Sequence, residues 1–72
     1  MLWLNDSEIE SIDPISYSII FDARPHKRDW HIEFQGDKQV TLSDGAEKRL
    51  SFDSEREATL YCLSRWPTLR KI

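Results

Sequence analysis

Residues 15–23 read ISYSIIFDA, and this segment sets the architecture of the chain. Four large apolar residues alternate along it with Ser16, Ser18, Ile20 and Asp22, which is the period-2 pattern of a β-strand with one buried face. The buried face would consist of Ile15, Tyr17, Ile19 and Phe21. We therefore predict a strand over residues 15–23.

The same alternation returns in the next segment, residues 29–35. There Trp30, Ile32 and Phe34 fall on one side, and His31 and Glu33 fall on the other. We expect the second side to face solvent, because it is polar, and we expect His31 to be exposed on it.

Two turn signals divide the remaining strand-like sequence. Gly36-Asp37 and Asp44-Gly45 each tolerate the positive φ angles of a tight reversal. These turns mark the ends of two further predicted strands, near 38–43 and 47–52. Since each strand would pair with its neighbour in sequence, we predict an antiparallel meander of three or four strands over residues 15–52.

A helix is predicted over residues 54–66. Ser54 and Glu57 have the spacing of a capping box, in which the serine hydroxyl accepts from the N3 amide. Pro67 disfavours helical conformation at Trp66 and so ends the helix.

One stripe of this helix is expected to pack on the sheet. At 3.6 residues per turn, Ala58, Cys62 and Trp66 align, with Tyr61 on one side of them and Leu63 on the other, whereas Leu60 points away. The predicted fold class is therefore α+β, an antiparallel three- to four-stranded β-meander with one C-terminal α-helix packed on one face.

The chain has 72 residues, so we treat 1–72 as a single small globular domain that ends in a tail over residues 67–72. The sequence does not decide the secondary structure of the arm formed by residues 1–14. Leu2 and Leu4 alternate as in an edge strand, whereas Ile9 and Ile12 have the spacing of a helical turn.

Composition excludes several classes of protein. The single cysteine, Cys62, allows no internal disulfide and no cysteine-cluster zinc site. No apolar run approaches the ~20 residues of a membrane span, and the first residues do not resemble a secretion signal. We expect a cytoplasmic protein without a cofactor or a metal site.

Catalysis is not expected. His26 and His31 lie five residues apart without a cysteine between them, and His31 is explained by its place on a polar strand face. Cys62 falls on the predicted buried stripe, past the middle of its helix, where a thiolate is not stabilised. We predict that the protein is not an enzyme.

Two short basic segments offer an alternative function. Arg24, His26, Lys27 and Arg28 form a predicted loop. A second basic segment near the end of the chain consists of Arg65, Arg70 and Lys71, and the two together favour contact with phosphates. The net charge of −3 and the pI near 5.2 are atypical of nucleic-acid-binding domains. Nucleic acid is therefore the second choice of partner.

Some large side chains have no burial site in the predicted fold. We expect Trp3, Ile20 and Leu60 to make apolar contacts with a partner, and the basic loop of residues 24–28 to make polar ones. The predicted function is that of a small accessory or inhibitor-like protein that binds another protein or a second copy of itself. In the alternative, residues 1–14 fold over the open sheet face and bury it.

Overall fold

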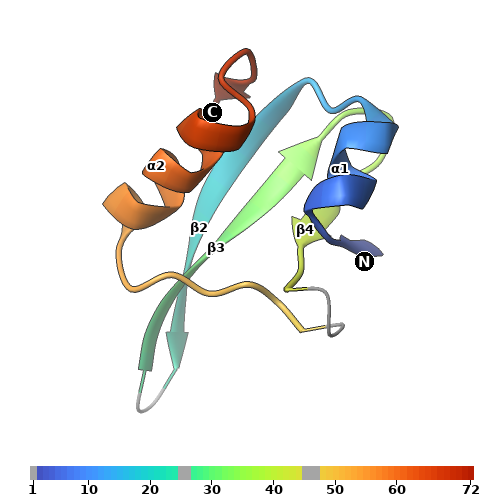
Figure 1. The fold of residues 1–72 in the computed structure, drawn as a ribbon. Helices are drawn as coiled ribbons and strands as arrows, with labels where there is room; N and C mark the ends of the chain where they lie inside the picture. Colours follow the sequence, from blue (N-terminus) through green and yellow to red (C-terminus); the bar gives the residue numbers. More distant parts are fainter. Residues whose placement is uncertain (1, 25–26, 45–47) are drawn as a thin grey trace.

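The structure is a computed structural model that describes residues 2–24, 27–44 and 48–72. For residues 2, 24, 27 and 28 it describes the backbone only. Its described strands form one five-stranded mixed sheet in the order β1-β4-β3-β2-β5 (Figure 1). The strands are β1 (Leu2–Leu4), β2 (Ser16–Arg24), β3 (Lys27–Gln35), β4 (Val40–Leu42) and β5 (Arg70–Lys71). The helices are α1 (Asp6–Ile12) and α2 (Glu55–Arg65).

The α+β class is confirmed, and the three central strands pair antiparallel in chain order as part of a larger mixed sheet. β2 pairs with β3 along its whole length, and β3 pairs with β4 through Phe34 and Val40. The hairpin is longer than predicted, because Ala23 pairs with Arg28 and Arg24 pairs with Lys27. The expectation of a loop at these residues was therefore wrong, and His26 lies outside the described residues.

Two outer strands extend the sheet: β1 is the edge strand that the sequence left open at Leu2 and Leu4, whereas β5 was not predicted. β1 lies parallel to β4, and β5 lies parallel to β2, so the sheet is mixed rather than a pure meander. The predicted fourth strand near 47–52 is reduced to isolated bridges, Ser43 with Arg49 and Trp30 with Phe52. Phe52 pairs with β3 instead of β4, because the chain leaves β4 here to reach α2. The turn predicted at Asp44-Gly45 falls partly outside the described residues.

The arm at the start of the chain contains both structures that the sequence left open, a strand and a helix. Asn5 begins α1 with a reciprocal capping box, in which its Oδ1 accepts from the Glu8 amide at 3.1 Å and its own amide donates to Glu8 Oε1 at 3.2 Å. The prediction of a single helix was therefore wrong, because this capped segment forms a second helix near the start of the chain. The predicted cap of α2 is confirmed, since Ser54 Oγ accepts from the Glu57 amide at 3.1 Å.

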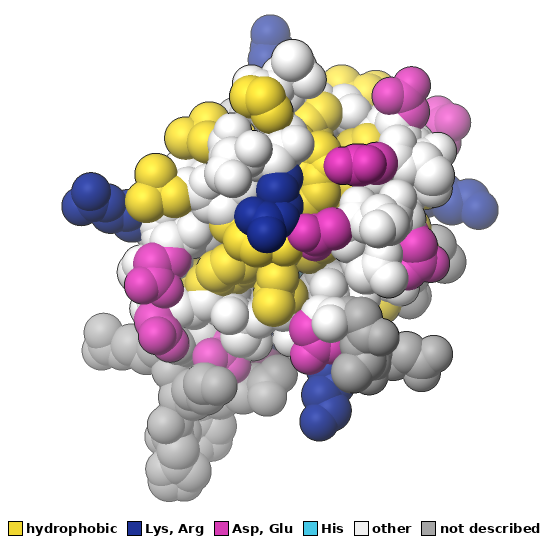
Figure 2. All heavy atoms as spheres, viewed as in Figure 1, with side chains coloured by type: hydrophobic (Ala, Val, Ile, Leu, Met, Phe, Trp, Pro, Cys, Tyr) yellow, Lys and Arg dark blue, Asp and Glu magenta, His cyan; other side chains and the backbone are white. Residues whose placement is uncertain are grey.

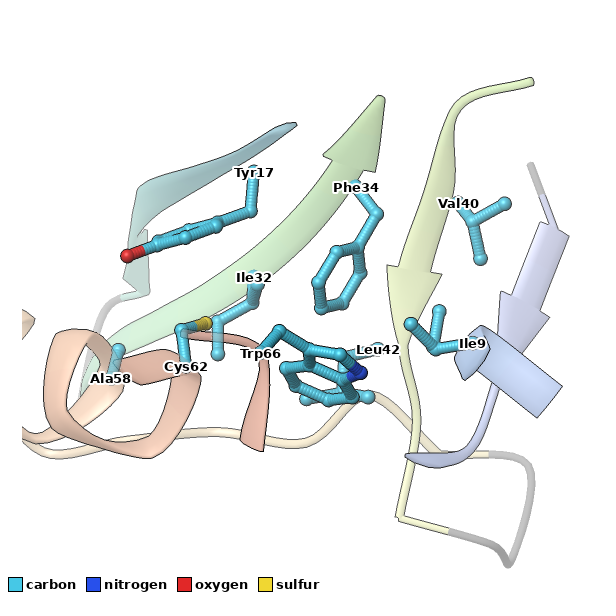
Figure 3. Close-up of a cluster of buried hydrophobic side chains, with 9 residues drawn as sticks. All are labelled: Ile9, Tyr17, Ile32, Phe34, Val40, Leu42, Ala58, Cys62 and Trp66. Atoms are coloured by element: carbon cyan, nitrogen blue, oxygen red, sulfur yellow. The ribbon is translucent and has the colours of Figure 1, made fainter. Parts of the chain in front are cut away.

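Both helices pack on the same face of the sheet, and one core lies between them and the strands (Figure 3). The buried apolar residues are Ile9, Tyr17, Ile32, Phe34, Val40, Leu42, Ala58, Cys62 and Trp66. The predicted stripe of α2 is thus confirmed. Phe34 and Trp66 meet edge to face with ring centroids 4.9 Å apart. Burial of each such large side chain contributes ~1.5–3 kcal/mol.

The helices do not cover the whole face. Ile15 precedes β2 and is 71% exposed, and Phe21 is 44% exposed although its ring lies 4.9 Å from that of Trp30. Leu63, expected beside the buried stripe, is 50% exposed. The predicted burial of these residues was wrong. Ile15 lies before the first residue of β2, Phe21 lies where β2 extends beyond α2, and Leu63 lies at the outer side of that helix.

Candidate functional site on the helix-free face

On the opposite face of the sheet the described residues form no helix, because α1 and α2 share the core side. One row of paired residues crosses it, from Trp3 through Thr41 and Glu33 to Ser18. We call this surface the helix-free face. It is formed by Trp3, Ser16, Ser18, Ile20, Asp22, Asp29, His31, Glu33, Gln35 and Thr41. The alternative that residues 1–14 bury it is wrong, because α1 packs in the core.

A connected group of polar side chains lies on this face. Arg49 Nη1 donates to Asp22 Oδ2 at 2.5 Å and to His31 Nδ1 at 3.4 Å. His31 Nε2 lies 3.4 Å from Glu33 Oε2, and Gln39 Nε2 donates to Glu33 Oε1 at 2.7 Å. We call these five residues the polar cluster. It joins β2 and β3 to the segments on either side of β4.

The polar cluster fixes the hydrogen-bonding roles of His31. An arginine guanidinium only donates, so His31 Nδ1 must accept from Arg49. The neutral imidazole therefore carries its proton on Nε2 and donates it to Glu33. Both ring nitrogens are engaged within the protein.

His31 shares a face with Glu33 as predicted, but it is only 7% exposed. The expectation of an exposed histidine was wrong, because Arg49 approaches it from the segment after β4. The sequence signal was available: Leu50 and Phe52 alternate as inward residues, which places Arg49 on the outward side. Local alternation alone did not reveal which residue Arg49 meets.

Cys62 lies on the other side of the sheet from His31, on the core-facing side of α2. Burial, together with the charge of Asp6, raises the pKa of its thiol to about 12, so the thiol remains protonated at neutral pH. Within the described parts of the chain, no group of three or more His, Cys, Asp or Glu side chains is arranged to hold a metal ion.

The predicted apolar contact residues divide between two surfaces. Trp3 is 40% exposed and lies on the helix-free face, which also carries the half-buried Ile20 three strands away. Leu60 is 52% exposed on the outer side of α2. The structure therefore brings Trp3 and Ile20 onto one face and separates Leu60 from them.

The two basic segments do not lie together. Arg70 pairs with Ser16 at the start of β2, whereas Arg24 ends that strand. Eight residues of extended strand place these positions about 26 Å apart. Near the end of the chain, Arg65 contacts Asp6. Lys71 similarly contacts Glu55, so both cations are already paired with carboxylates.

No protein family, curated protein or solved structure matches this chain. The functional argument therefore depends on the residues themselves. Of the helices in the described residues, neither combines the length and apolar character needed to cross a membrane. The helix-free face carries the ordered polar side chains and one large exposed aromatic residue, and it is the candidate site.

Proposed function

We propose that this chain is a small non-enzymatic protein that binds another protein through its helix-free face. The observation that carries the proposal is the position of Trp3. Its indole is 40% exposed, yet its row neighbour Thr41 is fully buried on a face without a helix. An exposed aromatic residue thus lies on the edge strand of a face that carries mostly polar side chains.

This arrangement has the chemistry of a protein interface. Tryptophan is enriched among residues that dominate binding energy, because it buries a large area and loses little conformational entropy. The polar cluster supplies a fixed pattern of donors and acceptors beside it. These side chains are already held by hydrogen bonds to one another, so binding a partner would cost little additional side-chain conformational entropy.

The proposal is tested by affinity capture with the full chain, followed by identification of the bound protein. Trp3→Ala combined with Ile20→Ser should abolish a stoichiometric complex. The matched control is Ile12→Ser, since Ile12 is 39% exposed but lies on α1. Circular dichroism would establish that all variants are folded. A complex that survives the double substitution would rule out the helix-free face as its binding surface.

Nucleic acid is the competing partner, and the separation of the two basic segments argues against it. A gel-shift assay at low salt tests it directly, because phosphate contacts weaken steeply as salt rises. Serine substitutions at Arg24, Lys27 and Arg28 should leave protein capture unchanged. A salt-dependent shift that these substitutions eliminate would replace the proposed function with nucleic-acid binding.

A further inference from the structure

Arg49 is held in the polar cluster by a single nitrogen. The two hydrogens of Nη1 serve two acceptors, Asp22 Oδ2 at 2.5 Å and His31 Nδ1 at 3.4 Å. Arg49 Nε is buried and has no hydrogen-bond partner in the described chain. The position of the guanidinium therefore depends on these two groups remaining acceptors.

His31 is the acceptor that can change its role near neutral pH. Histidine ordinarily gains or loses its charge between pH 5 and 8, whereas carboxyl groups titrate below this range. A proton from solvent would bind His31 at Nδ1, because Nε2 already carries one and donates it to Glu33. The new N–H would point at Arg49 Nη1. Two donors and two positive charges would then meet at 3.4 Å.

The other charged groups around the ring are carboxylates. Asp22 approaches from β2, and Asp29 and Glu33 lie two residues before and after His31 on the same face of β3. β4 has no charged residue. Glu33 can accept from Nε2 whether the ring is neutral or charged. Among the described side chains, the cation that opposes an imidazolium here is Arg49, which comes from the segment after β4.

Of the two cations that would meet, Arg49 is the one able to leave. His31 is buried on β3, where it pairs with Ile20. Arg49 lies outside the named strands, is joined to Ser43 by an isolated bridge, and has a side chain that is 23% exposed. Its guanidinium can therefore turn into solvent. The imidazolium can then replace it as the donor to Asp22, because both were bound to the same Nη1.

We propose that the polar cluster is a pH-sensitive switch in which protonation of His31 displaces Arg49. At neutral pH the guanidinium is fixed beside the ring. In mildly acidic solution it is released, and the helix-free face presents a different set of ordered donors and acceptors. As control of partner binding this inference rests on the proposed function, and binding should be stronger in the neutral state, in which Arg49 is ordered.

The core should not respond over the same pH range. Its titratable side chains, Tyr17 and Cys62, keep their protons there, because burial raises the pKa of both groups. Figure 2 shows the helix-bearing side of the molecule, where hydrophobic side chains gather over α2 and no described histidine is visible. The change is therefore expected on the helix-free face, in a chain that remains folded.

The test is NMR spectroscopy of the full chain between pH 8 and pH 5. The ring nitrogens of His31 should show one transition, from the neutral form protonated on Nε2 to the imidazolium. Across this transition, solvent exchange of the Arg49 Nε proton should become at least tenfold faster relative to that of Arg56, which is exposed on α2. The comparison removes the general effect of pH on exchange.

Two substitutions separate His31 from the other histidine of the chain. His31→Gln supplies a side chain that can accept from Arg49 at every pH, so Arg49 should stay protected throughout the range. His26→Gln is the matched control and should leave the transition unchanged.

Three results would overturn the switch. They are a His31 ring that stays neutral down to pH 5, an Arg49 proton that stays protected when the ring is charged, and a pH response that persists in His31→Gln. The chain is measured alone, so failure to capture a partner would not affect these results. A failed switch would likewise leave capture at neutral pH as the test of the proposed function.

Discussion

Asp6 and Tyr61, which are 55 residues apart in sequence, meet between the two helices. Both carboxylate oxygens of Asp6 lie 2.7 Å from the Tyr61 hydroxyl, which donates to them. Arg65 Nε also donates to Asp6 at 2.7 Å, and the Arg65 guanidinium lies 3.8 Å above the Tyr61 ring. These contacts join α1 to α2 across the top of the shared core.

Asp6→Ala should lower the free energy of unfolding by about 1–2 kcal/mol, because it removes the acceptor for a half-buried hydroxyl. The ion pair with Arg65 should contribute little of this, since both side chains are at least 40% exposed. Urea denaturation measures the loss. Ser7→Ala, in the same helical turn, is the control and should change stability by less than ~0.5 kcal/mol.

A double-mutant cycle isolates the contact between the two helices. Tyr61→Phe removes only the hydroxyl, so the combination with Asp6→Ala should be less destabilising than the two single changes added together. A purely additive result would show that the Asp6 carboxylate does not interact with the Tyr61 hydroxyl in solution.

The same contact predicts a loss of stability at alkaline pH. Burial, followed by the hydrogen bond and charge of Asp6, raises the pKa of Tyr61 from 10.0 to about 12. Between these values the unfolded phenol has lost its proton and the folded phenol has not. The unfolded state therefore binds fewer protons, and stability falls as pH rises through this window. Denaturation at several alkaline pH values should show a shallower decline in Tyr61→Phe.

The Cys62 thiol should resist chemical labelling in the native protein. It is fully buried, and the pKa of about 12 leaves almost no thiolate at pH 8. A thiol-specific chromogenic reagent should react only as fast as the protein unfolds, and one thiol per chain should react immediately in denaturant. Rapid labelling of the native protein would contradict the burial of Cys62 between α2 and the sheet.

The central strands and α2 were predictable because their patterns are local and long. Tyr17 and Phe34 each belong to an extended alternation, and Ser54 begins a capped helix. β1 and β5 have three and two residues, so the alternation of Leu2 and Leu4 left β1 undecided and β5 gave no pattern. They exist because β4 and β2 offer unpaired edges, and this is a property of the assembled sheet rather than of either segment.

The candidate site, like the fold, was predictable only in part. Trp3 was predicted to contact a partner because the predicted fold left it no burial site, and in the structure its side chain is partly exposed. The environment of His31 was missed, because Arg49 reaches it from 18 residues away. Alternation assigns a residue to a face, but it does not determine which side chains meet there.

Arg49 therefore supports the most direct test of the polar cluster. Arg49→Met keeps much of the apolar side-chain length but removes the donor shared by Asp22 and His31. We expect a loss of about 1–2 kcal/mol in the free energy of unfolding, because the polar groups around it lose a bonding partner. Arg56→Met, on the exposed side of α2, is the matched control and should change stability by less than ~0.5 kcal/mol.

The imidazole of His31 reports the same contact without reference to stability. Long-range nitrogen–proton correlation spectra of the native protein, recorded where the ring is neutral, should place the proton on Nε2, because Nδ1 accepts from Arg49. In Arg49→Met this constraint disappears, so the Nδ1-protonated tautomer should become populated. A native ring protonated on Nδ1 would mean that Arg49 does not donate to it, and the polar cluster would then not be a fixed surface that a partner recognises.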